Sequence, residues 1–375
     1  MNGDLKLDCR NYVGTKPCAA NRLCEGCPHY EPVGRKILII KLAAMGDVLR
    51  TTPLLRALKS QDPNCHITWV ADRASIPLLQ GNPMIDRLLP MDIGTALRME
   101  VETFDLALCL DKEDAAIGLV EKARAAKKMG FGLDPSGSIR PLNPEAWYAF
   151  SLGLSDELKF VKNTRTYQDF TFESVGLTFA GEEYVFALTD KEREKGFSRL
   201  RRAGWRVGRK AVGLNTGAGP VFATKKWTID GFVELARLAH ERLDSQIVIL
   251  GGPEEVERNR EIINRLGPWA IDAGCDNPLR IFAAMLSHLD LVVTGDTLAM
   301  HLCIAQKAPV IALFGPTCGQ EVELYCRGEK LVGRADCMPC YRSSCDDVRC
   351  LKSISAQRVF ESVELWLAGG SGRTP

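Results

Sequence analysis

The sequence predicts an α/β fold with two doubly wound, parallel-sheet domains that face each other across a cleft. Three features of the 375-residue chain support this fold class. The apolar run Ile37–Ile40 ends in a glycine-containing turn, after which apolar residues recur with helical spacing as far as Leu58. A second series of apolar runs alternates with helical segments over residues 211–314, beyond a charge-rich segment at 191–210. Such alternation is typical of parallel sheets joined by right-handed crossovers, and the length is sufficient for two cores.

In the first series, Ile37–Ile40 predicts a strand that is buried on both faces. The turn after it lies at the carboxyl edge of the sheet, where doubly wound folds bind ligands. Gly46 in this turn lets another molecule approach the backbone, and the adjacent Asp47 is a candidate functional group. The alternative is that Asp47 merely caps the following helix. Further strands are expected at residues 66–70 and 106–110, and a long loop at 130–144.

The second series is more regular. Its expected strands are residues 211–215, 246–250, 289–294 and 310–314. Thr228 is expected to cap a helix that runs to about Glu241, and Asn277 to cap another helix with Pro278 in its first turn. The segment 191–210 indicates a helix followed by a linker. Its basic residues favour a solvated helix face over a membrane-facing patch.

Composition excludes some classes of function. The net charge of +1 argues against a nucleic-acid partner, because proteins that track phosphates usually carry a basic excess. The polar amino terminus does not resemble a secretory signal, and no apolar run approaches the roughly 20 residues that span a bilayer. We therefore expect a cytoplasmic protein with at most a peripheral contact with the inner membrane.

Several turns of the second series are suited to a phosphorylated ligand. Gly217 and Gly219 leave backbone N–H groups free to face an anion, and Lys225 and Lys226 follow within reach. Glu254, just past a Gly-Gly turn, is placed like the acidic ribose-binding residue of dinucleotide domains. The GxGxxG fingerprint is missing from the sequence, which weakens a dehydrogenase interpretation.

A further turn, Asp296-Thr297, opens a helix whose amino terminus carries partial positive charge. Asp296 fits better as a cap, or as an acceptor for ligand hydroxyls, than as a direct phosphate contact. His301 lies one turn further along the same helix face. A lone helix histidine is more often structural than ligand-binding, so its residue type alone does not establish a contact.

Taken together, five segments resemble glycosyltransferase family 9, the heptosyltransferases of lipopolysaccharide core assembly and their relatives. The segments are KLAAMGDVLRTTPLLRALK, NTGAGPVFATKKW, VILGGPEE, TGDTLAMHLCIA and ALFGPT, and the resemblance covers roughly residues 36–367. It implies a GT-B fold with an acceptor-binding first half and a nucleotide-sugar-binding second half. It also implies an inverting transfer of heptose, or a related sugar, from an ADP-activated donor to a lipid-linked saccharide, with no catalytic cofactor.

The resemblance also implies residue roles. Asp47 becomes the general base, provided that burial or a neighbouring carboxylate holds its pKa up. Lys225 becomes the phosphate-binding lysine, and Glu254 the ribose contact. The other implied donor-binding residues are Thr216, Gly217, Lys226, Asp296, Thr297 and His301. Leu298 stands where many relatives have glycine, and we expect it to narrow the donor pocket.

Eight of the fourteen cysteines fall into two clusters. The clusters are Cys9, Cys18, Cys24 and Cys27, with His29 as a spare ligand, and Cys337, Cys340, Cys345 and Cys350. In a reducing compartment, clustered cysteines indicate metal more readily than disulfides, and the second spacing suits a closed four-thiolate site. Structural zinc, iron or an iron–sulfur cluster is expected at each, with zinc modestly favoured. Unligated thiols are the alternative.

The resemblance also connects the carboxyl-terminal cluster to known chemistry and architecture. Protein-modifying relatives of the autotransporter type carry a four-cysteine iron site near this end. In GT-B folds the last helix crosses back to the first domain. The helix expected at residues 355–367 would then bring the two clusters close together at the hinge.

These expectations define an organisation and two rival functions. The expected parts are a Cys-rich segment (1–32), an acceptor-binding domain (33–190), a linker (191–210), a nucleotide-sugar-binding domain (211–336), a Cys-rich metal-binding loop (337–354) and a crossover helix with a tail (355–375). One rival function is the same transfer to a protein acceptor. The other is a catalytically silent, metal-binding scaffold or sensor.

Overall fold

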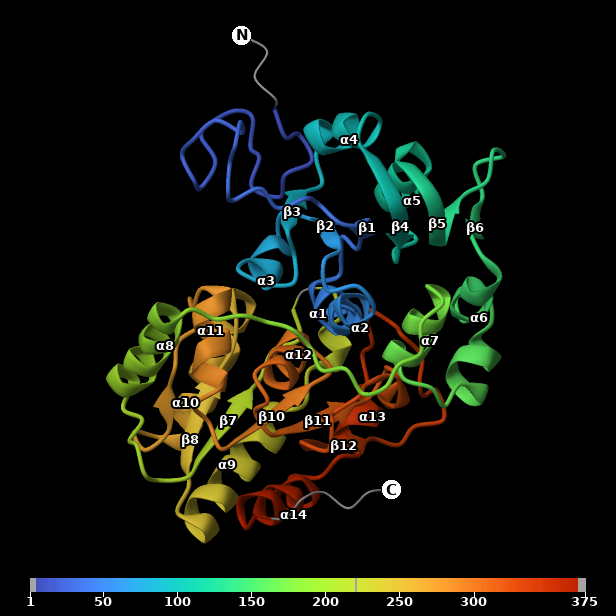
Figure 1. Ribbon diagram of the computed structural model, residues 1–375. Helices are drawn as coiled ribbons and strands as arrows, with labels where there is room; N and C mark the ends of the chain where they lie inside the picture. Colours follow the sequence, from blue (N-terminus) through green and yellow to red (C-terminus); the bar gives the residue numbers. More distant parts are fainter. Residues whose placement is uncertain (1–4, 220, 370–375) are drawn as a thin grey trace.

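The computed structural model describes residues 5–219 and 221–369, which form two α/β domains (Figure 1). Within these residues the first sheet has the strand order β3-β2-β1-β4-β5-β6 and the second the order β12-β11-β10-β7-β8-β9. The first set is β1 (Lys36–Ile40), β2 (His66–Ala71), β3 (Arg87–Pro90), β4 (Thr103–Cys109), β5 (Arg124–Leu133) and β6 (Ile139–Pro141). The second is β7 (Ala211–Asn215), β8 (Gln246–Leu250), β9 (Ile271–Asp272), β10 (Leu291–Gly295), β11 (Val310–Phe314) and β12 (Gly328–Val332).

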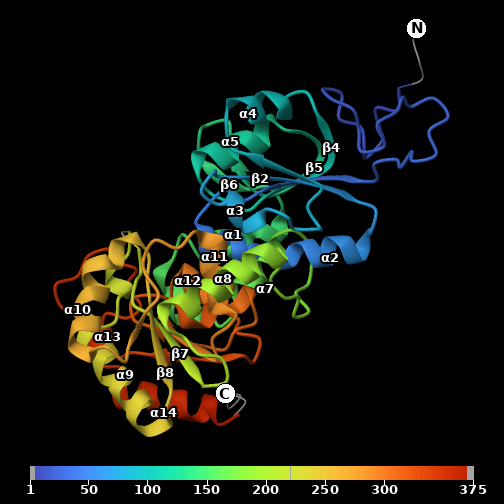
Figure 2. The same ribbon diagram turned by 90° about the vertical axis from the view of Figure 1, so that its left-hand side faces the viewer.

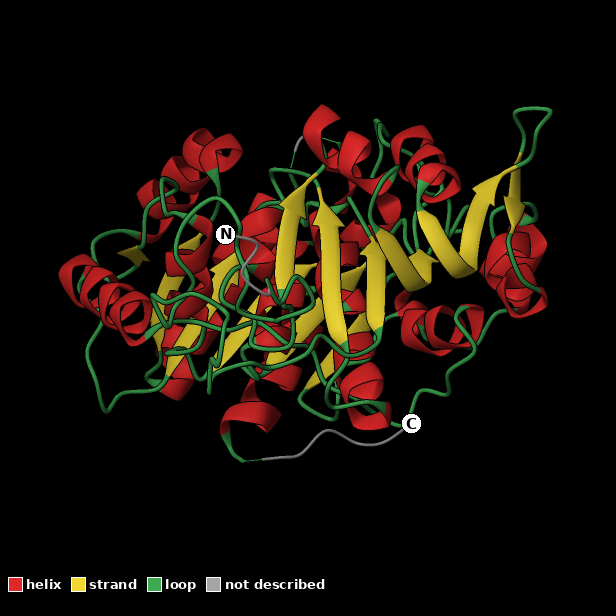
Figure 3. Ribbon diagram, turned by 45° about the horizontal axis from the view of Figure 1, so that its top comes forward, coloured by secondary structure: helices red, strands yellow, loops and turns green. Residues whose placement is uncertain are grey.

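Helices cover both sheets (Figure 3). Those of the first domain are α1 (Met45–Thr51), α2 (Pro53–Gln61), α3 (Ile76–Leu79), α4 (Ile93–Met99), α5 (Asp114–Lys122), α6 (Trp147–Ser151) and α7 (Tyr167–Ser174), with short turns η1 (Pro144–Ala146) and η2 (Glu157–Lys162). Those that follow are α8 (Asp190–Ala203), α9 (Ile229–Leu243), α10 (Val256–Leu266), α11 (Leu279–Leu286), α12 (Leu298–Ala305), α13 (Arg349–Lys352) and α14 (Ala356–Leu367), with turns η3 (Ala223–Lys225), η4 (Pro253–Glu255) and η5 (Gly319–Glu321). None of the helices in the described residues is long and apolar enough to cross a membrane.

The central strands are apolar because both of their faces are covered. β1 pairs in parallel with β2 and β4, and its residues Ile37–Ile40 are buried. β10 pairs in parallel with β7 and β11 and is buried along its length. Strands of this kind place the turns that follow them at one edge of each sheet. The predicted α/β fold with two parallel-sheet domains is confirmed, as is the capping of α9 by Thr228.

Three local predictions are wrong. The helix expected through Leu58 is divided into α1 and α2, because Pro53 has no N–H to continue the ladder. The loop expected at 130–144 contains the end of β5 and the edge strand β6, which pair antiparallel; its glycines and prolines obscured this pattern in the sequence. Asn277 does not cap α11, since its side-chain amide donates to the carbonyls of Ala273 and Gly274.

The expected return of the last helix to the first domain is also wrong. α14 packs against α9 and the second sheet, because its apolar residues Val359, Phe360 and Val363 belong to that domain's core. The amino-terminal Cys-rich segment lies at the opposite end of the molecule (Figure 1). The two cysteine clusters are therefore far apart and do not meet at a hinge.

The domains are joined by an extended segment, 177–189, and by Arg280 of α11. Figure 2 shows α11 and α8 of the second domain beside α3 of the first. The Arg280 guanidinium donates to the carbonyls of Pro77 (2.8 Å) and Gln80 (3.1 Å) near α3, and to Ala187 in the extended segment. It also pairs with Glu192 of α8. A single half-buried side chain thus connects four segments.

We expect Arg280→Ala to lower the free energy of unfolding by about 2–3 kcal/mol, because several charge-assisted hydrogen bonds are lost. The hydrogen bond from Arg280 also lowers the pKa of Glu192 from 4.5 to about 2. The associated stabilisation is complete above pH 4.5 and is lost as the pH falls to 2, so the variant loses this part of the pH dependence. Urea denaturation between pH 2 and 7 measures both effects. Arg260→Ala, which removes an exposed pair with Glu257, is the control and should change little.

Candidate functional site

Three connected cavities follow the junction of the two domains. The central cleft, of about 630 Å³, is lined by Asp47 and Arg50 from the first domain and by Lys225, Asp296 and His301 from the second. A first-domain pocket of about 250 Å³ shares Asp47 with the cleft. A second-domain pocket of about 380 Å³ shares with the cleft Ala218, Gly219, Thr297 and Leu298. A chain of cavities therefore runs from one domain to the other through Asp47.

The turn that carries Asp47 is shaped by contact with the other domain. A Cβ atom on Gly46 would lie 2.7 Å from Cδ2 of His301 on α12, so only glycine allows α1 to approach that helix. Asp47 lies in the first turn of α1, whose N-cap is Ala44. The interpretation of Asp47 as a simple cap is therefore wrong, and its carboxylate is available to the cavities.

Positive charges surround the Asp47 carboxylate. Arg50 Nε lies 3.0 Å from it, and the Arg50 guanidinium stacks 3.7 Å from the centre of the Tyr167 ring. Burial by itself would raise the pKa of Asp47, but the charges of Arg50 and Lys41 outweigh burial and lower it. The expected raised pKa is wrong, and Asp47 is ionised across the physiological range.

A buried ion pair lies behind this turn. Lys41, which directly follows β1, pairs with Asp111, which follows β4. The same Asp111 carboxylate accepts hydrogen bonds from the backbone N–H groups of Leu42 and Ala43. The pair holds the start of the turn and supplies one of the cations facing Asp47. Sequence reasoning missed it; a lysine directly after a buried strand was the available signal.

In the second domain the predicted residues are paired with one another. Lys225 Nζ lies 2.8 Å from Asp296, and Lys226 Nζ lies 3.0 Å from Glu255. Burial opposes ionisation of Asp296, but the Lys225 charge lowers the pKa of this carboxyl below its ordinary value. The lysine and aspartate predicted from separate motifs thus form one ion pair at the wall of the cleft.

The glycine-rich turns depend on Glu255, which sequence reasoning missed. Its buried carboxylate accepts a hydrogen bond from the N–H of Gly252, and a Cβ on Gly217 would lie 2.4 Å from its carboxyl carbon. The predicted Glu254 is exposed and lines the second-domain pocket. Thr216 turns away from the cavities, since it is buried and its hydroxyl donates to Asn259.

Two predicted residues lie on α12. Thr297 is its N-cap residue, and its hydroxyl lies 3.1 Å from that of Thr294. His301 is buried, with Nδ1 3.2 Å from the Tyr184 hydroxyl. Burial, with the nearby Arg50 charge, lowers the pKa of His301 to about 4, so the ring is neutral at physiological pH. Leu298 lines both the cleft and the second-domain pocket.

Two further groups at the site were not predicted. Glu321 lines the cleft with only 5% of its surface exposed, and its Oε1 has no hydrogen-bond partner among the described residues. Burial raises the pKa of this carboxyl. Lys112 lines the first-domain pocket with its Nζ 4.6 Å from the centre of the Phe131 ring, and burial lowers its pKa to about 8.

The carboxyl-terminal cysteines gather beside the cleft. Burial and the neighbouring thiols of Cys337, Cys340 and Cys345 raise the pKa of Cys350. The same loop contributes Tyr341 to the cleft wall, where its ring stacks on Phe160 with centroids 5.5 Å apart. These thiols suit zinc or iron as a donor set. Nevertheless, in residues 5–219 and 221–369 no three His, Cys, Asp or Glu side chains are arranged to hold one metal ion.

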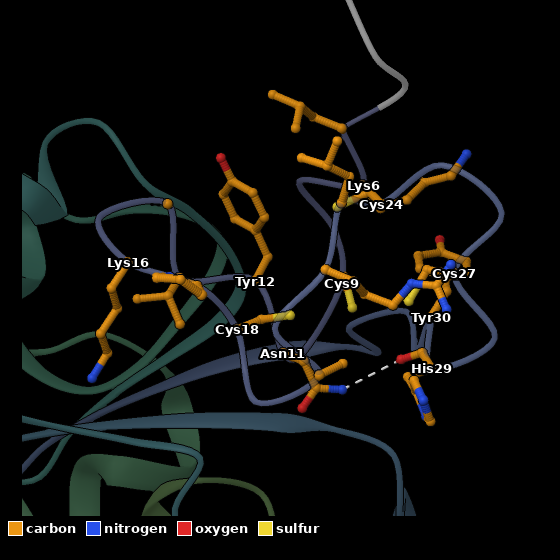
Figure 4. A pocket seen from close by; sticks show the side chains of 17 residues that line it. Lys6, Cys9, Asn11, Tyr12, Lys16, Cys18, Cys24, Cys27, His29 and Tyr30 are labelled. Carbon is orange, nitrogen blue, oxygen red and sulfur yellow. Dashed lines mark hydrogen bonds between the residues drawn. The ribbon is translucent and has the colours of Figure 1, made fainter.

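The amino-terminal cysteines line a separate cavity (Figure 4), which shares no lining residue with the cleft. All fourteen cysteines lie in the described part of the chain, and each is a free thiol. Hydrogen bonds from the backbone N–H groups of Ala20 and Arg22 lower the pKa of Cys18.

Comparisons with known proteins agree with this geometry. The family model described as glycosyltransferase family 9 (heptosyltransferase) matches residues 103–349. The lipopolysaccharide core heptosyltransferase OpsX of Haemophilus influenzae is 24% identical over 303 residues, covering 76% of this chain and 81% of that protein.

Solved structures show the same fold. A family 9 glycosyl transferase from Veillonella parvula superimposes with a TM-score of 0.71 at 21% identity, covering 90% of this chain and 98% of that one. The E. coli heptosyltransferase WaaC with ADP gives a TM-score of 0.58 at 18% identity, covering 90% and 99%. The fold is thus the GT-B arrangement of these enzymes, and the family match spans well over half of the chain. The protein belongs to glycosyltransferase family 9 and is a glycosyltransferase.

Proposed function

We propose that this enzyme transfers a heptose, or a closely related sugar, from an ADP-activated donor to a lipid-linked saccharide of the lipopolysaccharide-core type, with inversion at the anomeric carbon. The observation that carries the proposal is the position of Asp47. It lines both the first-domain pocket and the central cleft, and the Lys225–Asp296 pair lines the same cleft from the second domain. A relative of this chain is a lipopolysaccharide core heptosyltransferase, and a structural neighbour contains ADP.

The donor would occupy the second-domain pocket and the adjoining part of the cleft. Exposed Glu254 is free to accept hydrogen bonds from ribose hydroxyls. The diphosphate would lie beside Lys225 and the amino terminus of α12, where the cation and the helix dipole stabilise the charge that develops on departure. Leu298, at the passage between the two cavities, would restrict the size of the donor sugar.

The acceptor would enter through the first-domain pocket. Lys112 and the Asp47 carboxylate line this pocket, so an acceptor with both an anionic group and a free hydroxyl suits its walls. Such an acceptor, carried on a lipid, would place the enzyme at the cytoplasmic face of the inner membrane.

Asp47 would accept the proton of the acceptor hydroxyl as that oxygen attacks the anomeric carbon and the bond to the diphosphate breaks. Its lowered pKa keeps it ionised but makes it a weaker base than a carboxylate with a raised pKa, so the assignment rests on its position in the cleft. Neutral His301 adds no competing positive charge beside it. Closure of the two domains would exclude water from the cleft, which prevents hydrolysis of the donor.

The carboxyl-terminal thiols would hold a structural zinc or iron ion rather than a catalytic one. Their loop is tied to the cleft by the backbone N–H groups of Cys340 and Tyr341, which both donate to the carbonyl of Pro316. A bound metal would therefore brace the wall that carries Tyr341. No step of the transfer passes through this metal.

Lys225→Ala should abolish micromolar binding of ADP in calorimetric titration, because it removes the cation beside the diphosphate. Lys210→Ala is the matched control, since Lys210 pairs with Asp290 away from the cavities. Binding of ADP by both variants with equal affinity would contradict the proposed position of the diphosphate. Failure of the unaltered protein to bind ADP would contradict the proposed donor.

Asp47→Asn should lower kcat about 10²–10⁴-fold while ADP binding is retained, because the amide cannot accept the proton. Transfer of heptose from ADP-heptose to a core saccharide measures the rate. The control is Asp190→Asn on the exposed start of α8, which should be fully active. Near-normal turnover by Asp47→Asn would rule out this residue as the base.

The pH dependence of kcat/KM distinguishes the titration of His301 from that of Asp47. We expect kcat/KM to fall below about pH 4, as His301 becomes cationic, while the lowered pKa of Asp47 places its protonation at more acidic pH. His301→Gln, which does not titrate, should retain activity to lower pH because only the Asp47 limb remains. Far-ultraviolet circular dichroism at each pH confirms that the protein is folded. An unchanged acid limb in His301→Gln would show that His301 titration does not affect turnover.

A further inference from the structure

The amino-terminal segment encloses a cavity of about 230 Å³ that the transfer reaction does not use (Figure 4). Cys9, Cys18, Cys24 and Cys27 all line it, although they span nineteen positions of the sequence. Figure 4 shows the sulfur atoms of Cys9 and Cys18 directed into a common space, with Cys27 across from them. The remaining lining is mainly apolar and aromatic, and includes Leu5, Tyr12, Val13, Leu23 and Tyr30.

The segment around this cavity lacks the usual means of staying folded. Residues 5–32 contain turns and one isolated bridge, between Cys9 and Pro32, but no helix or longer strand. Leu7 and Leu23 expose 69% and 80% of their surface, so little apolar area is buried. Chain segments of this size usually need disulfides or a metal to hold one conformation. The cysteines here are free thiols that line one cavity, although no three of the described ones are arranged to hold a single metal ion.

We propose that Cys9, Cys18, Cys24 and Cys27 together hold an iron–sulfur cluster in this cavity. Four cysteine thiolates are the ligand set of [4Fe–4S] clusters. All four of these cysteines line the same cavity, so a cluster placed there could contact each of them. The apolar lining also suits a cluster, since exclusion of water protects it.

The size of the cavity favours a cluster over a single zinc ion. Four thiolates around zinc lie about 2.3 Å from the metal, which leaves no free space between them. Here the four cysteines, together with other residues of the segment, line a cavity of about 230 Å³, several times the roughly 30 Å³ that one water molecule occupies in the liquid. A polynuclear cluster fills such a space while still contacting every thiolate.

The position of the cavity separates the cluster from glycosyl transfer. Arg10 anchors the segment by donating to the carbonyl of Asn64 (2.8 Å) and to the Asp86 carboxylate. These residues precede β2 and β3, at the amino edge of the first sheet, whereas the cleft lies at the carboxyl edge. Figure 1 shows the segment on the side of the first domain that faces away from the second. The cluster would stabilise the segment or carry electrons, without contacting either substrate.

The test is metal and sulfide analysis of the full chain purified without oxygen. All variants carry Cys345→Ser, which disables the carboxyl-terminal thiol set. In this background we expect about four iron and four sulfide per chain, with visible charge-transfer absorption that bleaches on reduction. Cys18→Ser and Cys24→Ser should each lose most of the iron and the absorption. Cys326→Ser, at an exposed cysteine outside both clusters, is the control and should retain them.

Two further readouts distinguish cluster loss from misfolding. ADP binding by Cys18→Ser and Cys24→Ser should equal that of their Cys345→Ser parent, because the donor site lies in the other domain. Limited proteolysis should cut residues 5–32 faster in Cys18→Ser and Cys24→Ser than in Cys326→Ser. Stoichiometric zinc without sulfide, absence of metal, or iron and sulfide that persist in both variants would each overturn the proposal. These results do not depend on the proposed sugar donor or acceptor.

Discussion

The contact between α1 and α12 is the constraint on which the rest of the site depends. Gly46 lies against the His301 ring, and any side chain at Gly46 would force the two helices apart. Because each helix begins at the carboxyl edge of its own sheet, this contact brings the two edges together. Asp47 and the Lys225–Asp296 pair then face one cleft. Without this close approach, Asp47 of the first domain and the Lys225–Asp296 pair of the second would not line the same cleft.

Within the cleft, charges are paired before any ligand enters. Asp47 is held by Arg50, Lys225 by Asp296 and Lys226 by Glu255. Such pairs keep buried charges from being unpartnered, which would be costly. A bound diphosphate could take the place of the carboxylate beside each lysine. The lysine would then remain paired with a negative charge. The paired lysines would suit the anionic leaving group of the proposed transfer.

The two cysteine clusters are connected to different parts of the molecule. The carboxyl-terminal set is continuous with the wall of the cleft through Tyr341. The amino-terminal set is anchored through Arg10 at the opposite edge of the first sheet. A metal at the first would affect the shape of the active site, whereas a cluster at the second would act on its own segment. Their separation follows from α14, which packs on the second domain.

The sequence by itself determined the strands β1, β2, β4, β7, β8, β10 and β11, the turns that follow them and hence the edge at which Asp47, Lys225, Asp296 and His301 lie. These features are local: strand burial appears as apolar runs, and a parallel sheet places the turns that follow its strands at one edge. The break before Pro53 is also a local feature, but the continuous helical spacing of apolar residues obscured it. The edge strand β6 is local too, but the glycine-rich composition around it obscured its pattern.

Only the tertiary structure decided the electrostatics and the partners. The lowered pKa of Asp47 arises from Arg50, one turn away, and from Lys41 before the turn, whose directions depend on packing. Glu255, rather than Glu254, supports the glycine-rich turns, because the short turn η4 directs the second carboxylate inward. The burial of Glu321, whose Oε1 has no partner among the described residues, likewise had no signal in the sequence. The contact of Gly46 with His301 and the pairing of Lys225 with Asp296 join residues that are far apart in the chain, so no local pattern encodes them.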